Sequence, residues 1–492
     1  MNAGELKFDK MVVDVNLARE YIAQQSSEIN NVPHYKSHNV SKLLWNREEL
    51  NKLQEKFRTL SEIIEENKQL FCQLEYFIRN IPMKEVDEFD LKLLVNHLLY
   101  DKNCDLDVQV TGPYLFIDED TPLANLGWIT QIYRSYKPII VTSLKTKYIC
   151  YLFQQLCSQA GLIGVSLAIF NDKLEIDSDT NLLKFNNIKE IQNGCLGIIT
   201  NRSDIDSALA VFLETPMRKP WAICNILVEE CAVEKFKKAM SWKTRNQEKV
   251  DAAIVKQCTA SYSYEGKLFL FEYVGEKPTD KHVILINAYR TVKDLLGIAE
   301  KCVAVSLWAN DVAESNEIAH KLNTNIIWIN SFGNFNGPTE ASHAYFSIFN
   351  EQIYFNTKST EEIRRVLKSE WLQMDVCKRV KLLRKNFDVK INLPNFVHVG
   401  KEFVCTGVTL PIGVLYLDRN ITNVFEMIAF GNGLLVHAKV AQNNKIYNEL
   451  KNIGAPVEIV KEVSHEGDVI IYNNPIYKMK VIWTSYGTIF AN

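Results

Sequence analysis

The feature that most constrains the fold of this chain is a pair of similar segments, residues 110–147 and 404–442. Each reads as an apolar strand, an acidic turn, an amphipathic helix and a second buried strand, followed by a polar loop. A strand–turn–helix–strand unit of this kind opens a parallel nucleotide-binding sheet. The repeat therefore predicts an α/β fold in which one parallel-sheet unit occurs twice.

The rest of the chain alternates between apolar strands and helices, which implies a mostly parallel sheet. Strands are expected at 139–142, 164–170, 195–200, 223–229, 282–286 and 304–309, and the segment IIWINSFGNFNGP at 326–338 closes this half of the chain. Helices are expected at 42–79, 86–100, 147–160, 204–214, 232–240, 290–300, 312–322 and 360–386. The polar stretch 245–280 is expected to form a loop.

A second echo links the middle of the chain to its carboxyl end. The string IIWINSFGNFN at 326–336 returns in altered form as VIWTSYGTIFAN at 481–492. The second half therefore begins and ends like the first half but lacks its middle. This pattern predicts a condensed second copy rather than a solenoid.

Composition narrows the class of protein. The chain has 492 residues and a net charge of −3, with dispersed lysines and arginines, so nucleic-acid binding is not expected. No apolar run reaches the roughly 18–20 residues that span a bilayer, and the charged amino terminus lacks a signal-peptide core. The 11 cysteines form no Cys-x-x-Cys pair. We therefore expect a cytoplasmic protein that contacts neither nucleic acid nor membrane.

Three stretches, 137–162, 201–236 and 283–330, resemble elements of the aldehyde dehydrogenase superfamily in order and spacing. The first (KPIIVTSLKTKYIC…) resembles the strand, loop and helix that carry the cofactor-binding Lys-Pro-Ser-Glu motif. The second (NRSDIDSALAVFLETPMRKPWAICNILVEE…) resembles the surroundings of the catalytic cysteine, and the third resembles the late βαβ segment. A full copy followed by a shortened one is most similar to aldehyde dehydrogenase family 16.

The resemblance implies an aldehyde-dehydrogenase-like α/β fold with two parallel-sheet Rossmann-type domains and a condensed second copy. It also implies a homodimer, because the family pairs its subunits through strands. Alternatively, residues 388–492 cover an exposed sheet edge within one chain. The implied domains are a cofactor-binding-like domain at 1–205, a catalytic-like domain at 206–325, oligomerisation-type return strands at 326–358, and a helix with the truncated copy at 359–492.

The residues at the family's reaction positions depart from its pattern. The family uses a cysteine thiolate to attack the aldehyde, and an asparagine amide with a backbone N–H to hold the oxyanion. The nucleophile position falls at or within one residue of Pro220, which has neither a thiol nor an N–H. Cys224 follows four residues later and is expected to be a buried strand thiol. The oxyanion position falls at Asp120, whose carboxylate donates no hydrogen bond.

The acidic turn around Asp120 is expected to be solvated rather than to bind a metal. The cofactor positions are apolar as well, since Val141 replaces the family's lysine and Leu144 its ribose-binding glutamate. In the second copy these positions hold His437, expected to be structural, and Val440. The stretch 170–190 contains no glycine, so no turn there lets a pyrophosphate approach the backbone closely.

Two further positions complete the comparison. Glu190 occupies the general-base position, and without an acyl intermediate to hydrolyse we expect it to have a structural or surface role. In the second copy the oxyanion position holds Asn420 or Thr422, depending on where the gap falls.

Three functions are open, and the agreement among the losses favours the first. The first is a catalytically inactive homologue that acts as a binding or scaffold protein, with no cofactor and an unidentified protein partner. The second is NAD- or NADP-dependent oxidation of an aldehyde to a carboxylic acid by the displaced residues Cys224 and Glu190. The third is a small-molecule or nucleotide sensor that keeps the cleft without chemistry.

Overall fold

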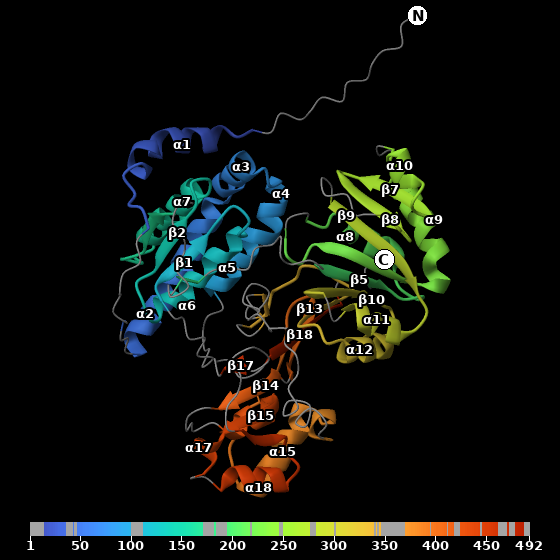
Figure 1. Ribbon diagram of the computed structural model, residues 1–492. Coiled ribbons are helices and arrows are strands. Elements are labelled where there is room, and N and C mark those ends of the chain that lie inside the picture. The colour runs from blue at the N-terminus through green and yellow to red at the C-terminus, as the bar shows by residue number, and fades with distance from the viewer. Residues whose placement is uncertain are drawn as a thin grey trace, which may run out of the picture. The chain divides into compact units, whose positions relative to one another are not determined.

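The chain divides into two compact units, one made of residues 1–102 and 110–185 and the other of residues 103–109 and 186–492. We describe each unit by itself. None of the described helices combines the length and apolarity needed to cross a bilayer. The computed structural model (Figure 1) describes residues 14–35, 43, 47–99, 112–170, 182–183, 194–216, 219–245, 249–275, 282–299, 302–338, 341, 344–345, 370–393, 395–410, 412–417, 424–442, 445–460, 470–471 and 478–486.

The first unit contains a four-stranded parallel sheet with the strand order β3-β2-β1-β4. Its strands are β1 (Tyr114–Ile117), β2 (Ile139–Thr142), β3 (Ser166–Ile169) and β4 (Leu182–Leu183). Its helices are α1 (Asn16–Ile29), α2 (Arg47–Glu66), α3 (Lys68–Arg79), α4 (Met83–Glu85), η1 (Val86–Leu91), α5 (Lys92–Leu99), η2 (Leu123–Trp128), α6 (Ile129–Tyr133) and α7 (Lys147–Gln159). The strand and helix expected at 139–142 and 147–160 are confirmed as β2 and α7.

The single helix expected over residues 42–79 is interrupted at Asn67, which separates α2 from α3. The Asn67 side chain donates a hydrogen bond to the Ile63 carbonyl at 2.8 Å. Asparagine side chains that bond the nearby backbone compete with helix continuation, which explains the break. The apolar face still crosses it, because Ile64 and Phe71 are both fully buried.

The second unit contains a ten-stranded sheet with the order β12-β13-β18-β11-β10-β5-β6-β9-β8-β7. Pairing is parallel from β18 to β8 and antiparallel at both ends. The strands are β5 (Cys195–Ile199), β6 (Ile223–Glu229), β7 (Ala260–Tyr264), β8 (Lys267–Phe271), β9 (His282–Tyr289), β10 (Ala304–Trp308), β11 (Ile326–Ile329), β12 (Phe396–Val399), β13 (Phe403–Leu410) and β18 (Lys478–Ser485). The helices are α8 (Ile205–Leu213), η4 (Glu230–Ala232), α9 (Val233–Lys243), α10 (Ala252–Val255), α11 (Val292–Ala299) and α12 (Val312–Lys321).

The prediction of a loop over 245–280 is wrong, because this stretch contains α10 and the hairpin β7–β8. Glu265 and Gly266 form its two-residue turn, both with positive φ, as the tightest hairpins require. The sequence of this stretch is rich in polar residues because β7, among the described strands, pairs with β8 alone. The residues of β7 are therefore half-exposed and can be polar. The missed signal is the run of tyrosines and phenylalanines on either side of a Glu-Gly pair.

The first domain was expected to extend to residue 205, but β5 pairs with β10 and β6 of the ten-stranded sheet. A parallel strand between two others is buried on both faces, and all five β5 residues are buried. The finer boundaries expected near residues 325 and 358 stay predictions.

The two strings that echo each other in sequence are neighbouring strands in the structure. β11 and β18 pair in parallel, with Ile327 opposite Ile482 and Trp328 opposite Trp483. β13 then pairs with the far side of β18. Residues of the second half therefore cover the edge of β11 within one chain, as the alternative to the homodimer requires.

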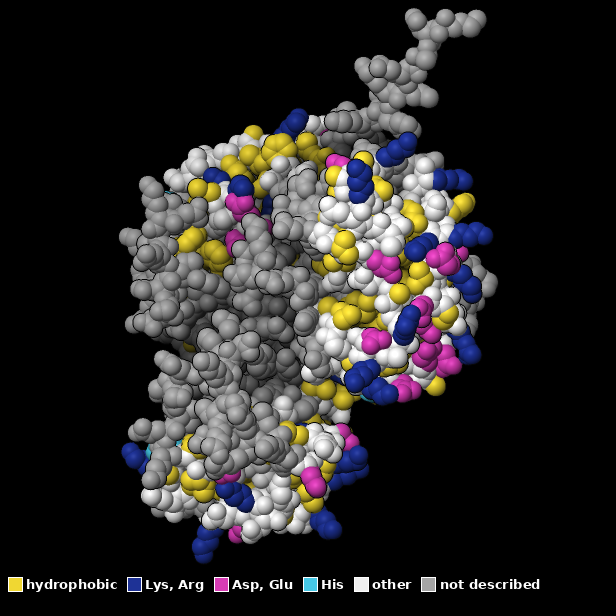
Figure 2. All heavy atoms as spheres, turned by 45° about the vertical axis from the view of Figure 1, so that its right-hand side comes forward, with side chains coloured by type: hydrophobic (Ala, Val, Ile, Leu, Met, Phe, Trp, Pro, Cys, Tyr) yellow, Lys and Arg dark blue, Asp and Glu magenta, His cyan; other side chains and the backbone are white. Residues whose placement is uncertain are grey.

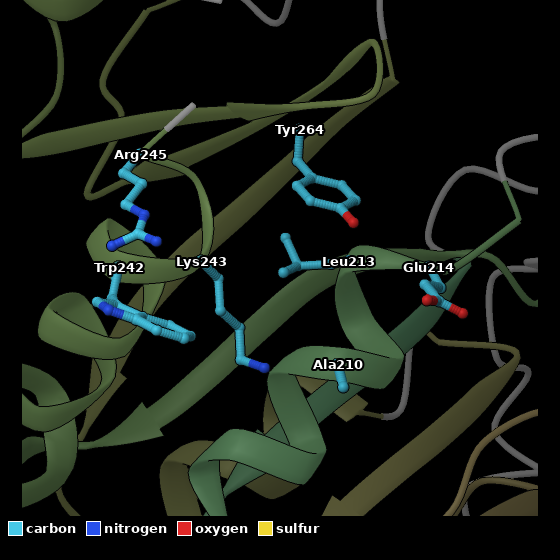
Figure 3. A pocket seen from close by; sticks show the side chains of 7 residues that line it. All are labelled: Ala210, Leu213, Glu214, Trp242, Lys243, Arg245 and Tyr264. Atoms are coloured by element: carbon cyan, nitrogen blue, oxygen red, sulfur yellow. The ribbon is translucent and has the colours of Figure 1, made fainter. Parts of the chain in front are cut away.

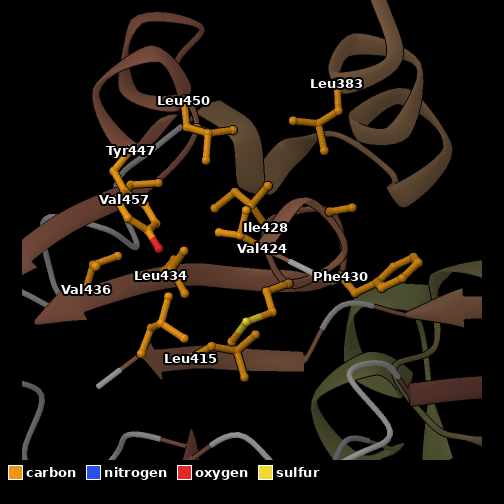
Figure 4. Close-up of a cluster of buried hydrophobic side chains, with 14 of the residues drawn as sticks. Leu383, Leu415, Val424, Ile428, Phe430, Leu434, Val436, Tyr447, Leu450 and Val457 are labelled. Atoms are coloured by element: carbon orange, nitrogen blue, oxygen red, sulfur yellow. The ribbon is translucent and has the colours of Figure 1, made fainter. Parts of the chain in front are cut away.

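The second copy forms a parallel sheet of its own with the order β16-β15-β14-β17. Matching β14 to β17 with β1 to β4 in chain order gives the strand order of the first unit's sheet, so the doubled unit is confirmed. Figure 4 shows side chains of α15, α16 and α18 meeting those of β14 and β15 in one apolar core. The elements are η5 (Glu370–Gln373), α15 (Val376–Phe387), β14 (Ile412–Leu417), α16 (Val424–Phe430), β15 (Gly431–His437), α17 (Ala438–Ala441), α18 (Ile446–Asn452), β16 (Val457–Val460) and β17 (Ile470–Ile471).

Candidate functional site

The expected nucleophile position lies in a tightly packed turn before β6. Pro220 is buried, and the next residue, Trp221, is fully buried. The Trp221 ring contacts Phe335 and Tyr345 edge-on, with centroids 5.2 and 5.3 Å away. Phe335 and Tyr345 in turn lie 5.1 Å apart. Trp221, Phe335 and Tyr345 therefore form a cluster of three aromatic rings directly after Pro220 in the chain.

Cys224, the displaced thiol, lies on β6 and is partly buried. Its Sγ donates to the Ala222 carbonyl at 3.4 Å. It also packs against Gly194, where an added Cβ would lie 2.5 Å from the sulfur. Cys302, another thiol of this unit, is buried, and burial raises its pKa to about 11.

The acidic turn after β1 uses its carboxylate to hold its own shape. Asp118 accepts hydrogen bonds from the backbone N–H groups of Asp120 and Thr121 at 3.0 and 2.9 Å, and from the Thr121 hydroxyl at 2.6 Å. The buried Arg79 donates to the Thr121 carbonyl at 2.6 Å and to the Glu119 carbonyl at 3.3 Å. No group of metal-ligating side chains occurs among the described residues.

The expected cofactor positions offer no polar group. Val141 is fully buried in a cluster with Tyr114 and Ala168, whereas the Leu144 side chain is 57% exposed. Sequence reasoning missed the polar residues of this loop, which are threonines. The Thr146 hydroxyl lies 2.8 Å from that of Thr142 and donates to the Ile117 carbonyl at 3.1 Å.

The structure brings the acidic turn and the 143–146 loop together at the carboxyl ends of β1 and β2. Ile117 pairs with Thr142, and the Ser143 N–H donates to the Ile117 carbonyl at 3.2 Å. Lys145 and Glu119 form an exposed ion pair across the two loops. Parallel sheets commonly bind ligands at the carboxyl ends of their strands. At the described part of this edge, the loops form the hydrogen bonds given above and one exposed ion pair.

In the second copy His437 caps α17, because its Nδ1 accepts a hydrogen bond from the Lys439 N–H at 3.2 Å. This local role agrees with the structural role expected for it. Val440 is buried. Glu190, Asn420 and Thr422 lie outside the described residues.

Several solved structures are similar to this chain. Proline Utilization A (PutA) from Corynebacterium freiburgense matches 96% of the chain at 10% identity with a TM-score of 0.59. Betaine aldehyde dehydrogenase from Staphylococcus aureus, in complex with NAD+, matches 65% of this chain and 78% of its own at 14% identity, with a TM-score of 0.44. Aldehyde dehydrogenase KauB from Pseudomonas aeruginosa matches 67% and 83% at 13% identity, with a TM-score of 0.47. No protein-family pattern and no curated sequence matches the chain.

The likeness is one of fold. The predicted α/β class, with a large, mostly parallel sheet and a second, smaller parallel-sheet copy, is confirmed. An identity of 10% shows shared architecture and nothing about activity. The chain also spans only 59% of the length of the PutA chain, so the functions of that protein do not transfer to this one.

Proposed function

We propose that this chain is a catalytically inactive, aldehyde-dehydrogenase-like protein that acts by binding other molecules, as a scaffold does. The packing around Pro220 carries the proposal. Proline supplies neither the thiol nor the N–H that acyl chemistry needs, and the next residue, Trp221, is packed against the rings of Phe335 and Tyr345. A tetrahedral intermediate needs an N–H donor within about 3 Å of its oxyanion, and Pro220 cannot provide one.

The cofactor positions support the same proposal. A bound dinucleotide needs polar contacts to its ribose and a turn whose backbone approaches the pyrophosphate. Val141 is buried among apolar side chains, and Leu144 has no polar atom on its side chain. These residues do not fit NAD or NADP, and we propose no cofactor.

Mixing the full-length chain with propanal and either NAD or NADP tests the proposal directly. We expect no NADH or NADPH to form. We also expect neither nucleotide to raise the melting temperature, because a ligand that binds only the folded state must stabilise it. A working aldehyde dehydrogenase in the same buffer is the control. A burst of NADH would contradict the proposal.

The alternative function is NAD(P)-dependent aldehyde oxidation by displaced residues. It requires Cys224 to ionise, although its thiol donates a hydrogen bond to the Ala222 carbonyl and packs against Gly194. Should NADH form, the variants Cys224→Ala and Glu190→Gln would show whether these side chains carry the reaction. Loss of the burst in Cys224→Ala would establish the displaced thiol as the nucleophile.

A further inference from the structure

The second unit has an open pocket whose lining includes none of the candidate site positions discussed above. Figure 3 shows its lining, which comes from the ends of α8, α9 and β7. Its volume is about 300 Å³. The lining residues are Ala210, Leu213, Glu214, Trp242, Lys243, Arg245 and Tyr264.

The pocket carries an excess of positive charge. Among the lining residues, Lys243 and Arg245 outnumber one carboxylate, that of Glu214. Lys243 also interacts electrostatically with the Asp204 carboxylate, which does not line the pocket. Within the described part of the chain, neither cation forms an ion pair. The partial negative charge at the carboxyl end of a helix such as α8 repels an anion. Here the buried Lys267 ammonium donates a hydrogen bond to the Leu213 carbonyl at that end, at 2.5 Å. The site therefore favours an anion.

The pocket also presents an exposed tryptophan. The Trp242 side chain is 63% exposed, and the Arg245 guanidinium lies 5.2 Å from its ring centroid. Packing of α9 does not need this ring, because Phe236 and Met240 are the buried residues of the helix. Arg245 is thus held beside a flat apolar surface, and ligand recognition often uses such Trp–Arg pairs.

Tyr264 completes the site from β7. In Figure 3 its hydroxyl points toward the space between Leu213 and Glu214, and the Lys243 ammonium points toward Ala210 on the same side. The hydroxyl is a hydrogen-bond donor and acceptor, and the ammonium is a donor only. A volume of about 300 Å³ is at the small end for ligand sites and too small for a dinucleotide.

We propose that this pocket binds a small planar anion, an aromatic or heteroaromatic ring that bears a phosphate or carboxylate. Lys243 and Arg245 bind the anionic group, and Trp242 stacks against the ring. The inference is independent of the proposed function, because it concerns a different surface.

Calorimetric titration of the full-length chain tests the proposal with three probes. Phenyl phosphate has both the ring and the charge, inorganic phosphate has only the charge, and benzylamine has the ring with the opposite charge. We expect phenyl phosphate to bind about tenfold more tightly than inorganic phosphate, the contribution of one stacked ring. We expect benzylamine not to bind. No binding of phenyl phosphate at millimolar concentration would overturn the proposal, as would equal binding of benzylamine.

Variants locate the site. Lys243→Gln and Arg245→Gln should each weaken phenyl phosphate binding about tenfold or more, the loss of one charge-assisted hydrogen bond. Trp242→Ala should reduce phenyl phosphate binding to the level of inorganic phosphate. Lys235→Gln removes an exposed lysine of the same helix outside the pocket, and is the matched control. Pocket variants that melt like the wild type yet bind phenyl phosphate unchanged would place the probe elsewhere and overturn the proposal.

Discussion

At the scale of single residues, the polar groups near the expected site are engaged in local structure. Asp118 holds its own turn, Thr146 closes the loop after β2, and His437 caps a helix. Buried polar groups need partners, and these side chains have found them nearby. The described polar side chains at these loops therefore stabilise local backbone structure.

The variant Gly194→Ala tests the packing around Cys224. Gly194 has a φ of 46°, and an added Cβ would lie 2.4 Å from the Ala222 carbonyl oxygen. We expect this substitution to lower the free energy of unfolding by about 2–4 kcal/mol, because backbone strain and overpacking add. The control is Gly266→Ala, where φ is 79° and the space is open, and which should cost about 1–2 kcal/mol. Equal losses in urea titrations would contradict the packing argument.

At the scale of elements, a buried lysine joins β18 to α12. The Lys480 ammonium donates to the carbonyls of Ala319, His320 and Leu322 at the end of that helix. We expect Lys480→Met to lower the free energy of unfolding by about 2–4 kcal/mol, because it leaves buried carbonyls without a donor. Lys321→Met is the control, since its ion pair is exposed and should be worth under about 1 kcal/mol. Thermal melts that rank the two variants equally would count against this role.

The same lysine predicts a pH dependence. Burial lowers the pKa of Lys480 from 10.5 to about 8. The unfolded chain then binds the proton more tightly, so stability rises as the pH increases from about 8 to about 10.5. Below that window both states carry the charge and the slope vanishes. Wild type should gain stability relative to Lys480→Met across the window, and parallel curves in denaturant titrations would refute the assignment.

At the scale of the whole molecule, the condensed second copy has two structural roles. It builds a parallel sheet whose strand order matches that of the first unit, and it adds β13 and β18 to the ten-stranded sheet. A strand edge left open invites pairing with another chain. The edge of β11 is closed by residues of its own chain, so a homodimer, still the expectation from the resemblance, has to use another surface.

Hydrogen exchange can test this arrangement. We expect the amides of Ile327 and Ile329, which lie on the side of β11 that faces β18, to be equally protected at low and high protein concentration, because β18 pairs with that side within the chain. Sedimentation on the same samples reports whether the mass is the 56.6 kDa of one chain or twice that. Protection of β11 that appears only when the dimer forms would contradict the intrachain pairing.

Much of the architecture could be predicted from local pattern. The strands β2, β5, β6 and β10 lie where apolar runs placed them, because a buried parallel strand reads as a continuous apolar segment. The hairpin β7–β8 could not be recognised this way, because β7 is half-exposed and its polar residues interrupt the apolar run. The break at Asn67 was also missed, because a single side chain bonded to the backbone leaves the helical apolar period unchanged.

The sequence alone determined the α/β class and the doubled unit, because residue type and periodicity are local properties. Tertiary structure decided the rest. Only the fold pairs Trp328 with Trp483, and only packing places Phe335 and Tyr345 against Trp221. Such contacts join residues far apart in the chain, and no local pattern encodes which of them meet. The repeat predicted a second parallel-sheet unit. The structure contains that unit, and it also adds β18 and β13 of the second half beside β11 in the ten-stranded sheet.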